Sequence, residues 1–322
     1  MACNAGPMRR LTSLLVLKLE QRGAATRLLA RRRQSDYASK AAQALVASNT
    51  IMSPEQSLYR ESETRNLLSH FGGGHIHLEK DENSGIARLL IEHEGKKNAF
   101  SGSMILQLAD HVAELSKWKD GRAVIIRGAN GDFCTGADLN FVQKIATPVL
   151  GAKMSIFMGS VLAKLHQLPL ITVAHVEGYA LGGGAELLSA CDFRAVSTTA
   201  NIGFVHGRLG VSPGWGGGTH LTQLVGWRTA LRLMASAQVL DANECLRLGL
   251  ADFVFSNDSE VSAWFEQFTK TSAQSVRAAK RIVLNAQECD YSESLNRERD
   301  VFAELWGGQR HLQALQKLAG SK

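Results

Sequence analysis

The chain has 322 residues, of which 45% are hydrophobic and 20% charged, and this size and composition predict a globular protein of one large domain or two smaller ones. The formal net charge is +6, but the first 50 residues alone carry nine basic and two acidic side chains. The rest holds 27 basic and 28 acidic residues, so no nucleic-acid partner is expected from charge.

Cysteine usage and hydropathy place further limits on the chain. The five cysteines are scattered and form no CxxC pair, which argues against a disulfide framework and fits a reducing compartment. No uninterrupted apolar stretch approaches the roughly 18 residues that a membrane span needs. A soluble protein without a membrane partner is therefore expected.

Residues 1–72 are assigned to a basic N-terminal extension. The stretch "LTSLLVLKLEQRGAATRLLARRR" is rich in arginine, poor in acidic residues and has leucines at helical intervals, which is the pattern of a mitochondrial transit peptide. An extension that is solvated and never cleaved is the alternative. A short polar helix is predicted within residues 53–74, where a run of glycines ends it.

The next segment, residues 73–257, has strands alternating with helices. Strands are predicted at 85–93 and 122–128, and the helix between them, 101–118, has serines available as its cap. A helix at 150–167, a strand at 168–178, a helix from about 184 and one or two strands in 193–204 follow. This alternation predicts an α/β fold with a mostly parallel sheet.

From about residue 227 onward the pattern is helical, and residues 258–322 are assigned to a helical C-terminal region. The sequence contains no repeat of 20 to 50 residues. It also contains no zinc-ligand spacing, no HExxH and no GxxxxGK[ST], so neither a metal site nor a nucleoside-triphosphatase is predicted.

Two stretches share one local pattern. "VIIRGANGDFCTGADLNFV" and "ITVAHVEGYALGGGAELL" each run from a strand through a loop into a tight glycine turn. Ligands of α/β folds collect where strands end and helices begin, and helix starts carry unpaired N–H groups with partial positive charge. Two such donors converging from two turns would form an oxyanion hole.

The motifs "FCTGADL", "VEGYALGGGAELLSACDF" and "GVSPGWGGGTHL" resemble the signature blocks of the enoyl-CoA hydratase/isomerase (crotonase) family, in order, over about residues 75–255. The resemblance implies a stack of ββα turns with a helical C-terminal region, assembled as a homotrimer or hexamer. It also implies an acyl-CoA substrate, with no cofactor beyond the coenzyme A of the substrate.

The resemblance also implies roles for particular residues. It places the two oxyanion-hole donors at the backbone of Ala137 and Gly183, beside Gly136 and Gly182. It matches Glu186 to the first of the two glutamates that hydratases use. The second glutamate is expected in the stretch "IGFVHGRLG", where this chain has His206 instead. Water addition by two cooperating carboxylates is therefore not expected.

"FVH", "SPGWGGGTHL", "NRERDVFAELWGG" and "FGGGHIHLEKDENSGIARL" resemble more narrowly the members of the family that decarboxylate ethylmalonyl-CoA. Decarboxylation of a malonyl thioester leaves an enolate whose charge lies largely on the oxygen that an oxyanion hole holds. A glutamate facing the departing carboxylate would repel it, whereas histidine is neutral or cationic near neutral pH. Either His206 or Glu186 could deliver the proton to the α-carbon.

Two alternatives stay open at this point. The chain could be a hydratase or isomerase that uses Glu186 alone, or a non-catalytic member of the fold that binds acyl-CoA. The preferred α-substituent and the stereochemistry are not readable from the sequence. The resemblance implies the cytosol, where such an enzyme would remove a mis-carboxylated by-product of fatty-acid synthesis, whereas the arginine-rich N-terminus favours the mitochondrial matrix.

The remaining candidates each have a structural alternative. Trp215 either lines the acyl pocket or only packs, and Asp138 is expected to start a helix rather than to act in catalysis. Lys97 and Asn98, in "GKKNAF", match a region in which relatives contact coenzyme A, although a lysine near a strand end is usually just solvated.

Overall fold

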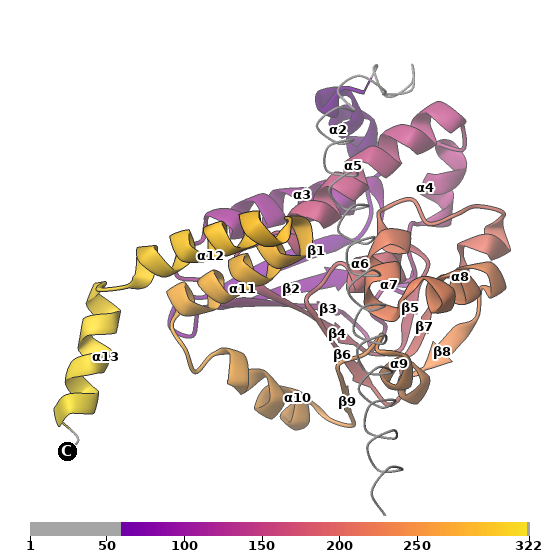
Figure 1. Cartoon of the computed structure of the whole chain (residues 1–322). Helices are drawn as coiled ribbons and strands as arrows, with labels where there is room; N and C mark the ends of the chain where they lie inside the picture. The colour runs from indigo at the N-terminus through magenta and orange to yellow at the C-terminus, as the bar shows by residue number, and fades with distance from the viewer. Residues whose placement is uncertain (1–58, 321–322) are drawn as a thin grey trace, which may run out of the picture. The chain divides into compact units, whose positions relative to one another are not determined.

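The computed structural model describes residues 59–320 (Figure 1). The chain divides into two compact units, and the described residues up to Arg281 belong to one unit, those from Ile282 onward to the other. The possible transit peptide lies outside the described residues. The assigned boundaries at residues 72 and 257 stay predictions.

The larger unit is built around a six-stranded sheet of order β1-β2-β3-β4-β6-β9. β1 pairs with β2 in antiparallel fashion, and every other neighbouring pair is parallel. This arrangement confirms the predicted α/β class with a mostly parallel sheet. The strands are β1 (His75–Asp81), β2 (Ile86–Glu92), β3 (Ala123–Gly128), β4 (Ile171–Val176), β6 (Phe193–Ser197) and β9 (Phe253–Phe255).

One face of this sheet is covered by α3 (Gly102–Lys117) and α5 (Pro148–His166), which lie on the same side in Figure 1. The Ser101 side chain accepts a hydrogen bond from the Met104 amide, so a serine caps α3 as predicted. By length and composition α5 could cross a membrane, but a core helix passes the same test, and Met158 and Leu162 of α5 are fully buried in the main core.

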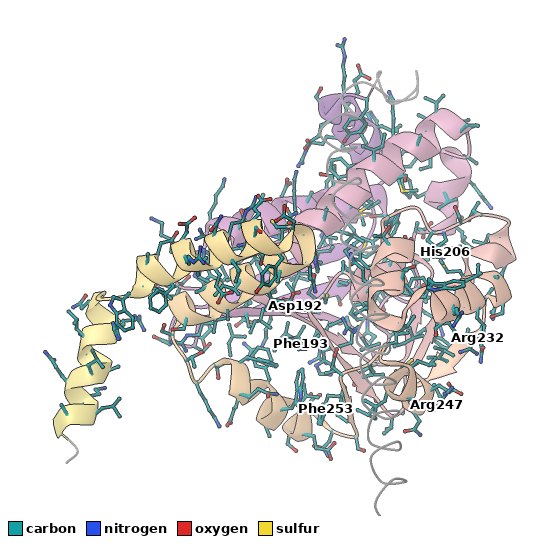
Figure 2. All side chains as sticks on the ribbon, viewed as in Figure 1. Asp192, Phe193, His206, Arg232, Arg247 and Phe253 are labelled. Carbon is teal, nitrogen blue, oxygen red and sulfur yellow. The ribbon has the colours of Figure 1, made fainter. Side chains whose placement is uncertain are left out.

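The other face of the sheet packs against α10 (Asp258–Phe265). Alternate residues of the central strands point toward α10. They form an apolar cluster between the sheet and α10 that is separate from the main core. Phe193 and Phe253, labelled in Figure 2, lie between the sheet and α10, and the Phe253 ring stacks on Trp264 with centroids 5.4 Å apart. The sheet is therefore covered by helices on both faces.

A second, three-stranded sheet has the order β5-β7-β8. Its strands are β5 (Tyr179–Leu181), β7 (Asn201–Gly203) and β8 (Val239–Asp241), each only three residues long. α6 (Gly183–Ser189) follows β5 directly, and the short 3-10 helix η3 (Val205–Leu209) follows β7. Three further helices accompany this sheet: α7 (Gly217–Val225), α8 (Trp227–Ser236) and α9 (Ala242–Leu248).

The region after residue 227 is helical as predicted, except that β8 and β9 interrupt it. β1 was also not among the predicted strands. Three-residue strands are too short to show a period of two, and β1 exposes charged side chains along much of its length. The remaining helices are α2 (Glu61–Ser69), α4 (Leu139–Lys144), α11 (Ala273–Glu288), α12 (Tyr291–Leu305) and α13 (Gln309–Gly320), with the 3-10 turn η4 (Glu266–Phe268).

A buried ion pair fastens the middle of α11 to the segments that lead into β4 and β6. The Lys280 ammonium donates hydrogen bonds of 2.7 Å to the Leu170 carbonyl and to the carboxylate of Asp192, which is labelled in Figure 2. The same carboxylate oxygen accepts from the amide and the hydroxyl of Thr172. Burial lowers the pKa of Lys280, and the carboxylate of Asp192 opposes that shift.

Candidate active site

A cavity of about 920 Å³ opens among α6, η3 and the first half of α5. This volume is within the range of pockets that bind small molecules. Apolar side chains of α4 and α5, such as Val142 and Met154, form much of its wall. Seven of the nine residues singled out from the sequence line it: Gly136, Ala137, Gly182, Gly183, Glu186, His206 and Trp215.

The two glycine turns meet at this cavity because their backbones pair. Cys134 donates to the Tyr179 carbonyl at 3.0 Å, and its own carbonyl accepts from Leu181 at 3.0 Å. The approach is so close that a Cβ on Gly184 would come within 2.0 Å of the Cys134 carbonyl oxygen. Gly184 is therefore needed because no side chain fits against the Cys134 backbone, and not because its φ angle is positive.

The amides of Ala137 and Gly183 have no partner among the described residues, although their neighbours are paired. Gly182 donates to Gly203, and Asp138 donates to Phe100. Both residues line the cavity close to the place where the turns meet. Two unpaired amides at one cavity wall are the kind of donor pair that an oxyanion hole needs.

Gly136 and Trp215 fix the surroundings of the Gly183 amide. Gly136 has a φ of +100°, and a Cβ there would lie 3.1 Å from the Gly183 nitrogen, so a side chain would cover the donor. A Cβ on Gly183 itself would come within 2.3 Å of the Trp215 ring. Trp215 thus packs against the turn and also lines the cavity, so both of the roles considered for it from the sequence apply.

Glu186 is 1% exposed, and its two carboxylate oxygens have different surroundings. Oε1 accepts hydrogen bonds from the backbone amides of Trp215 at 2.8 Å and Gly217 at 3.0 Å. Oε2 lies 3.0 Å from the Nε2 atom of His206. Because Oε1 is already an acceptor twice over, any proton that Glu186 holds must sit on Oε2, next to His206.

His206 comes from η3, close to the second sheet, and is labelled in Figure 2. Its Nε2 faces Glu186, while its Nδ1 is buried and has no hydrogen-bond partner among the described residues. A ring that served only packing would be expected to have both nitrogens satisfied. The two residues predicted as catalytic are therefore in direct contact, and one of them keeps unused hydrogen-bonding capacity.

Asp138 caps α4, as expected from the sequence. Its carboxylate accepts from the amides of Asn140 and Phe141 and lies 3.3 Å from the Lys96 ammonium. Burial alone would raise the pKa of Asp138, but these amides and Lys96 outweigh it and lower the pKa below its ordinary value. Lys96 lines the cavity with Asp138 and was not among the predicted site residues.

Lys97 and Asn98 do not line the cavity. The Asn98 side chain accepts from the His93 amide and donates to the carbonyls of Ala129 and Asp132, so it holds the loop together. Both donors of this side-chain amide are used within the protein, so it is not free to donate to coenzyme A, and the predicted substrate-binding role of Asn98 stays a prediction. The Lys97 ammonium lies 3.9 Å from the centroid of the Tyr179 ring, and its contact with coenzyme A stays a prediction.

Other lining residues had no motif that could have revealed them. Arg208 follows His206 by two residues, and its guanidinium donates to the Ala237 carbonyl at 2.7 Å. Ser155 on α5 donates to the carbonyl of Gly214. These residues reach the cavity through packing of separate elements, which a local pattern does not encode.

The sequence model of the enoyl-CoA hydratase/isomerase family matches residues 81–316 of this chain. The chain belongs to this family. Its fold and the order of its glycine turns agree with that membership, and the crotonase-like fold expected from the motifs is confirmed.

Several curated relatives with high similarity carry one name. Ethylmalonyl-CoA decarboxylase of Rattus norvegicus is 43% identical over 265 residues, which are 80% of this chain and 88% of the relative. The protein of that name from Danio rerio is 44% identical over 259 residues, covering 78% and 86% of the two chains. The Homo sapiens protein is 39% identical over 265 residues, covering 80% and 86%.

Solved structures give the same fold. An enoyl-CoA hydratase from Thermoplasma volcanium superimposes with a TM-score of 0.69 at 26% identity, covering 75% of this chain and 96% of that one. An enoyl-CoA hydratase from Bacillus anthracis gives 0.71 at 25% identity, covering 77% and 96%. Family members with different names thus share this scaffold, so the chemistry must be argued from the site.

Proposed function

We propose that this chain is a carboxy-lyase that decarboxylates a short branched malonyl-CoA thioester, converting ethylmalonyl-CoA to butyryl-CoA and methylmalonyl-CoA to propionyl-CoA. The observation that carries the proposal is the contact of His206 with Glu186 beside the free amides of Ala137 and Gly183. The similarity to proteins named ethylmalonyl-CoA decarboxylase supports it.

The first step breaks the bond between the α-carbon and the carboxylate carbon. The electron pair of that bond moves into the thioester, which becomes an enolate, and CO₂ leaves. The negative charge develops on the thioester oxygen, where the amides of Ala137 and Gly183 can donate to it. Such a donor is worth about 10²–10³ in rate when it is preorganised. The thioester is the electron sink, so we propose that no metal or organic cofactor takes part.

The second step places a proton on the α-carbon. The pair of Glu186 Oε2 and His206 Nε2 holds a proton at the cavity wall, and either member can pass it on. Two glutamates at these positions would set a second negative charge against the substrate carboxylate. An imidazole avoids that repulsion and can donate a hydrogen bond to the departing group.

The decisive test offers purified protein ethylmalonyl-CoA, methylmalonyl-CoA and crotonyl-CoA in parallel, and measures CO₂ release and the thioester product. Butyryl-CoA or propionyl-CoA without hydration of crotonyl-CoA is the expected result. Hydration of crotonyl-CoA without CO₂ release would instead favour a hydratase or isomerase that uses Glu186 alone. No turnover of any of the three would favour a non-catalytic acyl-CoA-binding protein.

We also propose a homotrimer or a pair of trimers, and a cytosolic location with the mitochondrial matrix as the alternative. Light scattering on the purified full-length chain measures the oligomeric mass. A monomeric mass would contradict the proposed trimer. A fluorescent fusion at the C-terminus leaves the basic N-terminus free, and its import into mitochondria would overturn the cytosolic assignment.

A further inference from the structure

A second group of ligand-type side chains lies outside the cavity. His175 is on β4, Glu177 follows that strand, and Asp258 is the first residue of α10. One ligand atom from each lies within 4.8 Å of the others, although Asp258 is 81 residues beyond Glu177 in the sequence. None of the three lines the cavity. Sequence spacing predicted no metal site because it cannot show this approach.

The alternation of β4 places His175 among these groups. Val173, two residues earlier, belongs to the apolar cluster on the α10 side of the sheet, so His175 points to that side too. The imidazole is 5% exposed and stands edge-on to Phe255, with centroids 4.8 Å apart. The Nε2 atom of the ring is the one that lies nearest to the carboxylates of Glu177 and Asp258.

The Nε2 atom of His175 is buried and lacks a hydrogen-bond partner among the described residues. It lies 3.7 Å from Asp258 Oδ1 and 4.0 Å from Glu177 Oε2, too far for a hydrogen bond to either. A buried imidazole nitrogen that has no hydrogen-bond partner and stands close to two carboxylates is free to ligate a metal ion.

We propose that His175, Glu177 and Asp258 bind a divalent transition-metal cation of the Zn²⁺ type. One imidazole nitrogen and two carboxylate oxygens form a mixed donor set that Zn²⁺ accepts and that Mg²⁺, which prefers oxygen ligands, does not favour. The two carboxylates balance the double positive charge. Tetrahedral ligands at about 2.1 Å from the ion stand roughly 3.4 Å apart, and the distances of 3.7 Å and 4.0 Å from His175 Nε2 to the two carboxylates exceed this by only a fraction of an ångström.

The side chains that must move are able to do so. The side chain of Asp258 is 68% exposed and that of Glu177 30% exposed, so both reach solvent and leave the ion an entry path. Arg127 lies 3.4 Å from Glu177 and is the cation that holds this carboxylate when no metal is bound. The ion would join the end of β4 to the start of α10, so binding should stabilise the fold.

The test titrates Zn²⁺ into chelator-treated full-length protein by calorimetry, with Mg²⁺ in a parallel cell and thermal unfolding as a second readout. Asp258→Asn and Glu177→Gln alter partly exposed side chains and should leave the fold intact. Each should weaken Zn²⁺ binding by at least about tenfold, since even the outer-sphere partners of a metal are worth roughly 10- to 100-fold. The rise in Tm with Zn²⁺ should shrink in the same two variants.

Glu92→Gln is the matched control, because the Glu92 side chain is 46% exposed and also lies 3.3 Å from a histidine, His77, but is not one of the three proposed ligands. It should bind Zn²⁺ like the wild type. No Zn²⁺ binding by the wild type, or equal binding by wild type, Asp258→Asn and Glu177→Gln, would overturn the proposal. Equal binding of Mg²⁺ would overturn the assignment to a transition metal. All of these readouts are independent of the proposed decarboxylation.

Discussion

At the scale of single residues, the site depends on an asymmetry in Glu186. Two backbone amides hold Oε1, and they come from a segment more than 25 residues away in the chain. A Cβ on Gly217 would lie 2.3 Å from the Glu186 Cγ, so the glycine is what lets that segment come close. The carboxylate is thus fixed in one orientation, with Oε2 directed at His206.

Gly136→Ala should reduce the rate of decarboxylation by about 10²–10³-fold, the value of one oxyanion-hole donor. The added methyl would stand 3.1 Å from the Gly183 nitrogen and cover its N–H. Single-turnover measurement of CO₂ release checks this. Gly131→Ala is the matched control, because Gly131 also has a positive φ but open space around it. If both variants lose activity equally, backbone strain is responsible and the covered amide is not.

His206→Gln should lower kcat by about 10²-fold or more, because the amide keeps a hydrogen bond to Glu186 but cannot transfer a proton. His206→Glu should be worse, since it sets two carboxylates about 3 Å apart and adds charge facing the substrate carboxylate. The measurement is kcat and KM for ethylmalonyl-CoA with each variant. Activity of His206→Glu at the wild-type level would contradict the charge argument.

The identity of the proton donor calls for a separate variant. Glu186→Gln keeps an acceptor for the amides of Trp215 and Gly217 but carries no acidic proton. If Glu186 is the donor, CO₂ release should exceed formation of the protonated thioester in the first turnover, whereas His206→Gln would show this imbalance if the histidine is the donor. Rapid quench with separate assays of CO₂ and butyryl-CoA makes the comparison.

At the scale of elements, the sequence predicted the parts that have a strong local signal. The helix at α3, its serine cap and the strands β2, β3 and β4 were all expected within a few residues. β5, β8 and β9 were missed because a three-residue strand is defined by its partner and not by its own periodicity. The turn around Gly136 was predicted from its motif, whereas the contribution of α5 to the cavity wall required the packed fold.

The ion pair between α11 and the sheet is a point where one substitution should act on a whole element. Lys280→Met removes the cation from Asp192, whose carboxylate then keeps only the donors from Thr172. Breaking a buried pair in this way costs about 3 kcal/mol of unfolding free energy. Urea unfolding followed by circular dichroism measures it.

The double variant Lys280→Met with Asp192→Asn should recover part of this loss, because no uncompensated charge stays buried. Lys119→Met, at an exposed lysine, should change stability by less than about 0.5 kcal/mol. Equal losses for the single and the double variant would show that the cost comes from packing at Lys280 rather than from charge.

At the scale of the whole molecule, two groups of polar side chains lie at separate places: the residues that line the cavity, and the group formed by His175, Glu177 and Asp258. The cavity gathers residues from both glycine turns, η3, α4 and α5, while the His175 group faces α10. The sequence predicted most of the first group because its glycines form motifs. The sequence could not predict the approach of Asp258 to His175 and Glu177, or that Asn98 does not line the cavity. Both depend on which distant residues the folded chain brings together.

The folding stability of the molecule should fall between about pH 6.5 and pH 4 because of His220. This residue on α7 lies against His166 of α5, with ring centroids 5.1 Å apart, and burial lowers its pKa to about 4. In that pH range the unfolded chain binds a proton that the folded chain does not, so acid favours unfolding. Above about pH 6.5 this group costs no stability, and the loss grows as the pH falls until it reaches about 3 kcal/mol at pH 4.

Urea unfolding at a series of pH values between 7 and 4 measures this slope. His220→Leu removes the titrating group from the packed interface and should flatten the slope, whatever its effect on stability at pH 7. His70→Gln, at an exposed histidine of the same unit, should keep the slope of the wild type. A slope that is as steep in His220→Leu as in the wild type would assign the acid sensitivity to other groups.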